Sequence, residues 1–242
     1  MDATSERELS IILPAYREMK NLEILIPQIE EEFRDVAHEV IVVDDHSEDG
    51  TRELVENMHS TNPNIMLLER PGLMGIGSAL RDGYNRARGE FILSSDADLS
   101  FSVQDMKRLL VEARNGFDLV LGYRVPPPGS KQTSIKGWFE NAIISPMSNL
   151  TIGVISGMGL RNYNTDFRLI RASVWKKLRT VENRQFFLFE TIFRAKKAGA
   201  RMTEIPVTFS PRRFGESKVS FFKQAWAYFV KLIRMVFFDR SV

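Results

Sequence analysis

The sequence predicts an α/β fold built on a parallel sheet, and three observations lead to this prediction. Short, continuous apolar runs recur along the first half of the chain, segments with helical spacing separate them, and polar or acidic residues follow them. Apolar strands of this kind are typical of parallel sheets covered by helices on both faces. Such sheets bind ligands outside the carboxyl ends of their strands. The 242 residues, 43% of them apolar, exclude a disordered, collagen-like or coiled-coil chain.

The first half of the chain alternates strand and helix signals. Residues 9–13 (LSIIL) predict a buried strand that ends at Pro14, and residues 18–33 carry apolar side chains at helical spacing. Further strands are predicted over 39–43, 65–68, 90–94 and 117–122, and further helices over 51–58, 78–87 and 103–114. The ends of these strands carry Pro14, Asp44-Asp45, Asp96-Ala97-Asp98 and Gly122-Tyr123-Arg124. We therefore expect the ligand site to be built from these strand ends.

The pattern changes after residues 126–129 (PPPG). An uncharged stretch over 141–160 comes first, and then a segment over 165–170, a short helix, a second helical segment over 186–198 and a strand over 201–209. Residues 220–238 have apolar side chains at helical spacing, with lysine and arginine among them. Such a helix fits core packing and a position in a membrane interface about equally well. We expect neither a spanning helix nor a signal peptide.

Composition excludes several classes of function. The chain has no cysteine, which rules out a disulfide framework, a cysteine nucleophile and a thiolate metal site, and suits a reducing compartment. Its 33 basic and 31 acidic residues give a net charge of +2, which is too even for a nucleic-acid binder. The three histidines do not form a pattern that is typical of a zinc site.

Asp96-Ala97-Asp98 is the sharpest local feature. In an extended segment, residues two apart point to the same side, so the two carboxylates repel each other unless a cation lies between them. Carboxylate oxygens favour Mg²⁺ or Mn²⁺, often shared with substrate phosphates. Taken alone, the motif fits a solvated turn before a helix about equally well.

Three other segments carry weaker signals. Asp44 or Asp45, after the second strand, is expected to bind a nucleotide base or ribose. The glycine-rich segment 72–77 precedes a helix and could approach a phosphate, although by itself it fits a simple turn. The basic turn over 212–218 (RRFGESK) suits an anionic ligand, although by itself it fits an exposed charged loop.

In this order, the motifs resemble the family-2 inverting glycosyltransferases with the GT-A fold, and more closely the dolichol-phosphate mannose synthases and their polyprenyl-phosphate relatives. The resemblance covers about residues 8–220. It is carried by 14–18 (PAYRE), 43–45 (VDD), 49–51 (DGT), 75–79 (GIGSA), 96–99 (DADL), 122–124 (GYR), 166–169 (DFRL), 194–199 (RAKKAG), 204–209 (EIPVTF) and 212–218.

The resemblance implies a single Rossmann-like GT-A domain over 1–242, with 130–160 and 217–238 as membrane-interface helices. The implied activity is transfer of mannose from GDP-mannose to a polyprenyl (dolichyl) phosphate, with inversion, by a peripheral protein at the cytoplasmic face of a membrane. It also allows for a membrane-anchoring partner subunit. Three alternatives stay open: UDP-glucose as the donor, a hydroxyl acceptor, and a nucleotide-sugar-binding regulatory subunit without turnover.

The resemblance also implies roles for individual residues. Donor binding is implied for Pro14, Ala15, Tyr16, Glu18, Asp44, Asp45, Gly77, Asp96, Ala97 and Asp98, with Mg²⁺ or Mn²⁺ held by Asp96 and Asp98. Neutralisation of the donor diphosphate and the acceptor phosphate is implied for Arg124, Arg168, Arg212 and Lys218, and a catalytic role for Asp98, Arg124 and Arg212.

The chain departs from the family at three positions. Arg17 stands where Asn is usual, Ser100 where Gln is often a third metal ligand, and Asp166 where a small residue is usual. The third metal ligand is therefore left open between Ser100 and water.

Overall fold

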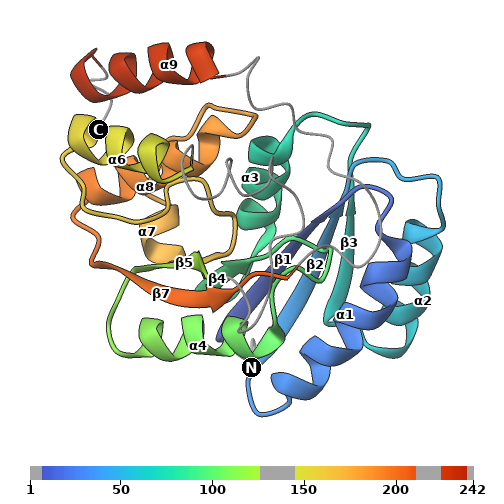
Figure 1. Cartoon of the computed structure of the whole chain (residues 1–242). Coiled ribbons are helices and arrows are strands. Elements are labelled where there is room, and N and C mark those ends of the chain that lie inside the picture. The colour runs from blue at the N-terminus through green and yellow to red at the C-terminus, as the bar shows by residue number, and fades with distance from the viewer. Residues whose placement is uncertain (1–6, 126–144, 211–224, 239–242) are drawn as a thin grey trace.

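The computed structural model describes residues 7–125, 145–210 and 225–238, which form a seven-stranded sheet with helices on both faces (Figure 1). The strand order is β3-β2-β1-β4-β6-β5-β7. The strands are β1 (Leu9–Ala15), β2 (His38–Asp44), β3 (Ile65–Glu69), β4 (Phe91–Ser94), β5 (Leu119–Val125), β6 (Arg168–Arg171) and β7 (Met202–Thr208). The helices are α1 (Met19–Glu32), α2 (Thr51–Thr61), α3 (Ile76–Arg86), α4 (Val103–Arg114), α6 (Ser145–Ser156), α7 (Ala172–Trp175), α8 (Phe186–Lys197) and α9 (Ala225–Phe238).

The elements predicted over residues 9–122 are all present, with ends that differ by no more than three residues. Alternate residues of the central strands explain why their sequences are apolar throughout. Ile11 and Val42 face the core under α1, α2 and α4, whereas Ile12, Ile41 and Val43 face the core under α3, α7 and α8. Because side chains of a strand alternate between the two faces of a sheet, a strand covered on both faces needs an unbroken apolar run.

The sheet is not parallel throughout, and this corrects the sequence prediction. Strands β1, β2, β3 and β4 are parallel, and β7 is parallel to β5. Strand β6, however, lies between β4 and β5 and is antiparallel to both. A short apolar run carries no signal for strand direction, so the sequence could not show that this strand reverses. The reversal matters for the site, because it brings the start of β6 to the edge where β4 and β5 end.

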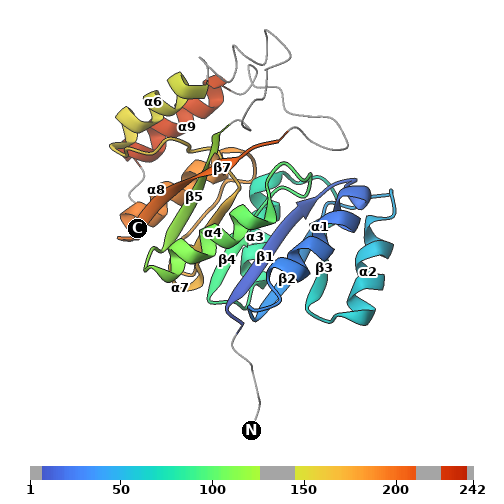
Figure 2. The ribbon, with the colours of Figure 1, turned by 60° about the horizontal axis from the view of Figure 1, so that its bottom comes forward.

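Helices α6 and α9 lie side by side on the outer surface of the α8 layer, as two views show (Figures 1 and 2). One side of α9 is buried there through Leu232 and Met235. Within the described residues, no helix is long and apolar enough to cross a membrane. Of the two predicted interface segments, residues 130–144 and 217–224 lie outside the described part of the chain, and the interface role of both segments stays a prediction.

Candidate active site

The carboxyl ends of the four parallel strands meet at one edge of the sheet. Ala15, the last residue of β1, is in register with Asp44, the last residue of β2, and Asp44 is in register with Glu69 at the end of β3. Strand β4 joins this edge where the amide of Ser95 donates to the carbonyl of Ile12, 3.2 Å away. The predicted donor residues therefore come from neighbouring strand ends.

The antiparallel strand β6 delivers a second set of residues to the same edge. Its first residue, Arg168, is in register with Ser94 at the end of β4, and the Ser94 hydroxyl donates to the carbonyl of Asp166, 2.5 Å away. The amide of Gly122, near the end of β5, donates to the carbonyl of Phe167 at 3.0 Å. Asp166 and the end of β5 are thus brought beside Asp96 and Asp98.

Asp44 and Asp45 are both buried and are held by different partners. Asp44 accepts hydrogen bonds from the amide (2.8 Å) and hydroxyl (2.5 Å) of Ser47, which fixes the loop after β2. Asp45 accepts a hydrogen bond from the guanidinium of Arg70. Burial raises the pKa of Asp45, and the positive charge of Arg70 opposes that rise. The pair therefore forms two fixed carboxylates at the carboxyl end of β2, and nucleoside binding by them stays a prediction.

Arg70 is a residue that the sequence prediction missed. It directly follows β3, and its side chain is 3% exposed. Besides Asp45, its guanidinium contacts the hydroxyl of Ser78 and lies 3.0 Å from a carboxylate oxygen of Asp82, both on α3. Its position was the available signal. An arginine that follows β3 lies within reach of the two aspartates at the end of the neighbouring strand β2.

Pro14 and Ala15 belong to β1, and Tyr16 and Glu18 follow them into α1. The carboxylate of Glu18 accepts a hydrogen bond from the side-chain amide of Asn21 at 2.5 Å. In the loops after β1, β2 and β4, one residue other than glycine takes the left-handed backbone conformation in each: Arg17 (φ 62°), His46 (φ 63°) and Leu99 (φ 63°). Backbone strain of this kind is concentrated in functional loops.

Asp96 lies among negative charges. Burial raises the pKa of Asp96 well above its ordinary value, and the nearby carboxylates of Asp166 and Asp98 raise it further, whereas Arg124 opposes the rise. The hydroxyl of Ser100 is buried and has no hydrogen-bond partner among the described residues, although its amide donates to Asp98 at 3.0 Å. Excess negative charge and an unsatisfied oxygen are the features that a cation would correct.

These residues fit a divalent cation of the Mg²⁺ type. Within the described ranges, no group of three histidine, cysteine, aspartate or glutamate side chains is arranged to hold a metal by itself. Mg²⁺ is usually held by one or two carboxylates, and substrate phosphates and water complete its coordination. Asp96, Asp98 and the orphan Ser100 hydroxyl supply oxygen ligands of that kind. Metal binding by Asp96 and Asp98 stays a prediction.

Arg124 is the basic residue that the structure brings to the acidic end of the site. Its guanidinium lies over two aromatic rings, 4.1 Å from the centroid of Phe209 and 5.6 Å from that of Phe101. Its side chain is exposed, and among the described residues it forms no salt bridge. A guanidinium held by rings keeps its hydrogen-bond donors available for an anionic ligand.

The structure corrects the expectation for Gly77. This glycine is buried under the segment before α8, and a Cβ atom there would lie 2.4 Å from the Cβ of Phe187 and 2.7 Å from the carbonyl oxygen of Arg184. Gly77 is therefore needed for close packing of α3 against that segment, which accounts for the glycine without a donor phosphate.

The expectation for Arg168 is also corrected. Its side chain is fully buried, and its guanidinium donates to the carbonyls of Thr165 and Leu188. Those contacts hold β6 against the segment before it and against α8. Arg168 is therefore a structural residue and does not face an acceptor phosphate. Arg212 and Lys218 lie outside the described residues, and their roles stay predictions.

Comparison with known proteins identifies relatives along most of the chain. Residues 10–179 match the family described as Glycosyl transferase family 2. The polyprenol monophosphomannose synthase of Mycolicibacterium smegmatis is 28% identical, in an alignment that covers 87% of this chain and 80% of that protein. The undecaprenyl-phosphate mannosyltransferase of Micrococcus luteus is 31% identical and is covered to 86%, as is this chain.

A solved structure shares the fold. The glucosyl-3-phosphoglycerate synthase of Mycobacterium tuberculosis, in complex with Mg²⁺ and uridine diphosphate, has a TM-score of 0.70 at 16% identity. The match covers 96% of this chain and 81% of that one. At this identity the likeness concerns the fold alone.

We expect Asp96→Asn to raise the stability of the metal-free protein at about pH 8. A carboxyl whose pKa is raised in the folded state favours the protonated form, so its contribution to stability is lost as the pH rises from about 4 toward the raised pKa. The substitution removes that loss and should add roughly 1–2 kcal/mol to the free energy of unfolding above this window. Calorimetry in EDTA across the pH range measures it.

Asp35→Asn is the matched control. A hydrogen bond from Lys107 lowers the pKa of Asp35, so this substitution should give no gain in stability at the same pH. Equal melting temperatures for Asp96→Asn and the wild type at all pH values would show that the acidic cluster carries no electrostatic strain.

Proposed function

Since the chain belongs to glycosyl transferase family 2, we propose that it transfers mannose from GDP-mannose to a polyprenyl phosphate, with inversion, at the cytoplasmic face of a membrane. The glycosyltransferase class and the GT-A fold predicted from the sequence are confirmed. The choice of mannose and of a polyprenyl phosphate is supported by the names of the relatives, one of which aligns over 86% of both chains.

The observation that carries the proposal is the meeting of unlike charges at the end of the sheet. Asp96 and Asp98 supply oxygen ligands at the end of β4, and Arg124 stands close enough at the end of β5 to act on the titration of Asp96. A nucleotide diphosphate carries negative charge that increases as it leaves the sugar. A divalent cation held by Asp96 and Asp98 would supply stabilisation of that charge.

The acceptor needs little from the protein beyond cationic contacts. A phosphate monoester is already an anion at neutral pH, so one of its oxygens can attack the anomeric carbon without a general base. The new bond forms between that oxygen and the sugar, and the bond from the sugar to the donor diphosphate breaks. We assign Arg124, and Arg212 from outside the described residues, to hold the attacking phosphate opposite the leaving group.

A surface suited to a lipid substrate lies on α6 and α9. We call it the α6–α9 face and define it by its exposed apolar side chains Leu150, Val154, Trp226, Phe229, Val230, Phe237 and Phe238. Trp226 and Val154 are each 75% exposed. Apolar patches of this kind mark interaction sites, and aromatic side chains beside basic ones suit a membrane interface. We propose that this face holds a single catalytic domain on the membrane that contains its acceptor.

A donor and acceptor panel tests the reaction directly. With labelled nucleotide sugars and short polyprenyl phosphates, GDP-mannose should give product that extracts into organic solvent, and UDP-glucose should not. Asp98→Asn should reduce turnover by about 10²–10³-fold, because one group that stabilises developing charge is lost. EDTA should abolish turnover of the wild type, and Mg²⁺ or Mn²⁺ should restore it. Asp35→Asn, an exposed aspartate, is the control.

Full turnover in the presence of chelator would contradict the proposed dependence on a divalent cation. Transfer from UDP-glucose in place of GDP-mannose would keep the lipid acceptor and change the donor, whereas sugar transfer without any lipid would favour the hydroxyl-acceptor alternative.

The acceptor assignment is tested with Arg124→Ala. Loss of a charge-assisted contact costs roughly 1.5–3 kcal/mol, so the KM for polyprenyl phosphate should rise by about tenfold or more. GDP affinity should change much less, which isothermal titration measures. Arg86→Ala removes an exposed arginine at the far end of α3 and serves as the control. An unchanged acceptor KM in Arg124→Ala would show that this arginine is a solvated surface residue that does not bind the acceptor.

The membrane assignment is tested by flotation with anionic liposomes. Burial of apolar surface contributes roughly 25 cal/mol per Å², and each basic residue near anionic lipid adds about 1 kcal/mol. Trp226→Glu plus Phe229→Glu should release the protein from vesicles. Both side chains point away from the core, so the variant should keep its fold and its affinity for GDP.

Gln28→Glu plus Val111→Glu adds the same charge to exposed positions of α1 and α4, across the sheet from α9, and should still float. Flotation of the Trp226 and Phe229 double variant at the wild-type level would rule out this face as the membrane contact. Unfolding of that variant would instead assign the two side chains to the core.

A further inference from the structure

Besides Arg124, another exposed arginine, Arg161, lies beside the end of β5. It belongs to the segment that joins α6 to β6, and its guanidinium is 4.6 Å from the centroid of the Tyr123 ring. Tyr123 directly precedes Arg124 near the end of β5. Both arginines are exposed, and each lies over an aromatic ring. The end of β5, where the proposed function places the acceptor phosphate, is therefore flanked by two guanidinium groups.

The two arginines lie on opposite faces of the sheet. Leu121 packs in the core that α3, α6, α8 and α9 cover. Because residues two apart in a strand point to the same side, Tyr123 and the Arg161 guanidinium over it lie on that side too. Phe101, under the Arg124 guanidinium, packs in the opposite core with α1 and α4. Arg161 is thus on the side from which a lipid held at the α6–α9 face would reach the end of the sheet.

The backbone at Arg161 is fixed by Glu204 of β7. The carboxylate of Glu204 accepts hydrogen bonds from the amides of Arg161, at 2.8 and 3.0 Å, and Asn162, at 3.0 Å. The hydroxyl of Tyr228 on α9 donates to the side chain of Asn164 at 2.7 Å. The segment is tied to β7 on one side and to α9 on the other, so the arginine has a set position between them.

Contacts within the protein do not occupy the hydrogen-bond donors of the Arg161 side chain. Among the described residues, its guanidinium forms no hydrogen bond and no ion pair, and the nearby Glu204 carboxylate already accepts from backbone amides. The ring of Tyr123 orients the guanidinium plane and leaves the N–H groups at its rim available. The planar fork of an arginine matches the oxygens of a phosphate.

We infer that Arg161 binds the phosphate of the lipid acceptor from the α6–α9 side of the sheet, with Tyr123 as the residue that positions it. The inference rests on the proposed function, since that proposal makes the acceptor a polyprenyl phosphate and places it at the end of β5. It deepens the proposal by adding a contact on the membrane side, opposite Arg124. A phosphate monoester has enough oxygens for one to attack the sugar while others accept from the two guanidinium groups.

The test is titration of the whole protein with geranyl phosphate, a short polyprenyl phosphate that stays in solution, so that neither turnover nor a membrane is needed. Arg161→Ala should weaken its binding by about tenfold or more, because a charge-assisted contact is lost. The KM for this acceptor should rise to a similar extent. GDP affinity and the melting temperature should stay at their wild-type values, because the side chain is exposed.

Tyr123→Leu tests the positioning role. The substitution removes a cation–π contact from Arg161, so the affinity for geranyl phosphate should fall by about two- to fivefold. If Tyr123 acts through Arg161, the double variant should bind no more weakly than Arg161→Ala alone. Additive losses in the double variant would contradict the positioning role.

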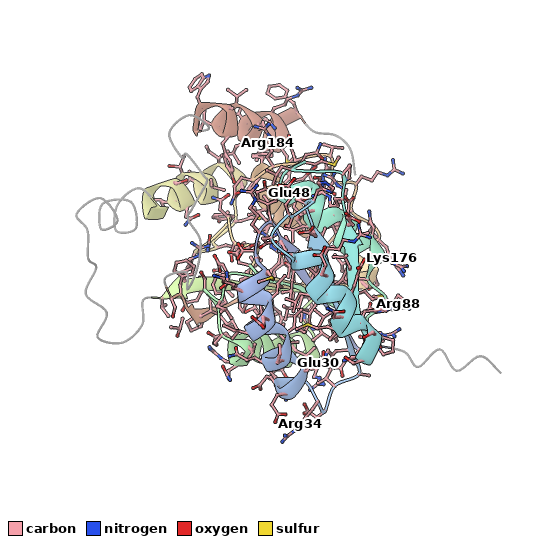
Figure 3. All side chains as sticks on the ribbon, turned by 90° about the vertical axis from the view of Figure 1, so that its right-hand side faces the viewer. Glu30, Arg34, Glu48, Arg88, Lys176 and Arg184 are labelled. Carbon is pink, nitrogen blue, oxygen red and sulfur yellow. The ribbon has the colours of Figure 1, made fainter. Side chains whose placement is uncertain are left out.

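Arg34→Ala is the matched control. Arg34 follows α1, and Figure 3 shows it at the lower end of the molecule, with α9 at the upper end. Its side chain is 74% exposed and pairs with the exposed Glu31, so its removal costs little stability. Arg34→Ala should bind geranyl phosphate as the wild type does. An equal loss of affinity in this variant would show that net charge, and not the position of Arg161, decides binding.

Flotation with anionic liposomes separates the acceptor from other phosphates of a membrane. Arg161→Ala should float as the wild type does, because the apolar side chains of the α6–α9 face are unchanged. Wild-type affinity for geranyl phosphate together with reduced flotation in Arg161→Ala would overturn the inference and assign this arginine to phosphate groups of the bilayer.

Failure of the inference and failure of the proposed function give different results. If Arg161→Ala keeps the wild-type affinity and KM for geranyl phosphate, the inference is overturned and mannose transfer to a polyprenyl phosphate stays in place. If the wild-type protein transfers sugar but neither binds nor uses geranyl phosphate, both the inference and the lipid-phosphate acceptor are overturned.

Discussion

Crowding of negative charge at the end of one buried strand is the constraint on which the rest of the site depends. Asp96 and Asp98 follow β4, and the antiparallel β6 brings Asp166 to the same place. Carboxylates that are removed from water cost free energy unless cations or hydrogen bonds compensate them. Within the described residues, Arg124 supplies part of that compensation and Ser100 keeps an unused oxygen. In the proposed function, a metal and the diphosphate that it binds would supply the remaining compensation for these charges.

Much of the fold could be predicted from the sequence, because the parallel half follows from one rule. Strands covered on both faces must be apolar throughout, so 9–13, 39–43 and 90–94 were recognisable without any structure. The acids at the ends of β2 and β4 were recognisable as strand-end residues for the same reason, and their roles in binding stay predictions. The direction of β6 was not predictable, because the apolar pattern of a four-residue strand does not depend on the direction in which the chain runs.

The residues assigned wrongly or missed depend on contacts between distant segments. Gly77 looked like a phosphate-binding glycine because a glycine at a helix start serves close approach of either a ligand or another backbone, and here the neighbour is the chain at Arg184. The family resemblance implied a phosphate contact for Arg168, and its burial was not expected because arginine is seldom buried. Its burial depends on the carbonyls of Thr165 and Leu188, which no local pattern reveals.

The chain before α8 links helices α9 and α3 to the carboxyl end of β2. Lys231 of α9 pairs with Glu182, and Arg81 of α3 donates to Asn183 at 2.8 Å. The amide of Ser78 donates to the carbonyl of Asn183 at 3.1 Å, and Arg70 joins the Ser78 hydroxyl to Asp45. Polar contacts therefore fix the α6–α9 face relative to the carboxyl end of β2. In the proposed reaction they would hold the lipid headgroup and the nucleotide in a constant relative position.

The most direct measurement is a crystal structure with GDP and Mn²⁺, with the metal located by its anomalous scattering. The account predicts one Mn²⁺ peak within bonding distance of Asp98 and Asp96, with the diphosphate on its far side and the nucleoside at the carboxyl ends of β1 and β2. A metal peak away from the end of β4, or a nucleotide bound elsewhere than at the carboxyl ends of β1 and β2, would contradict it.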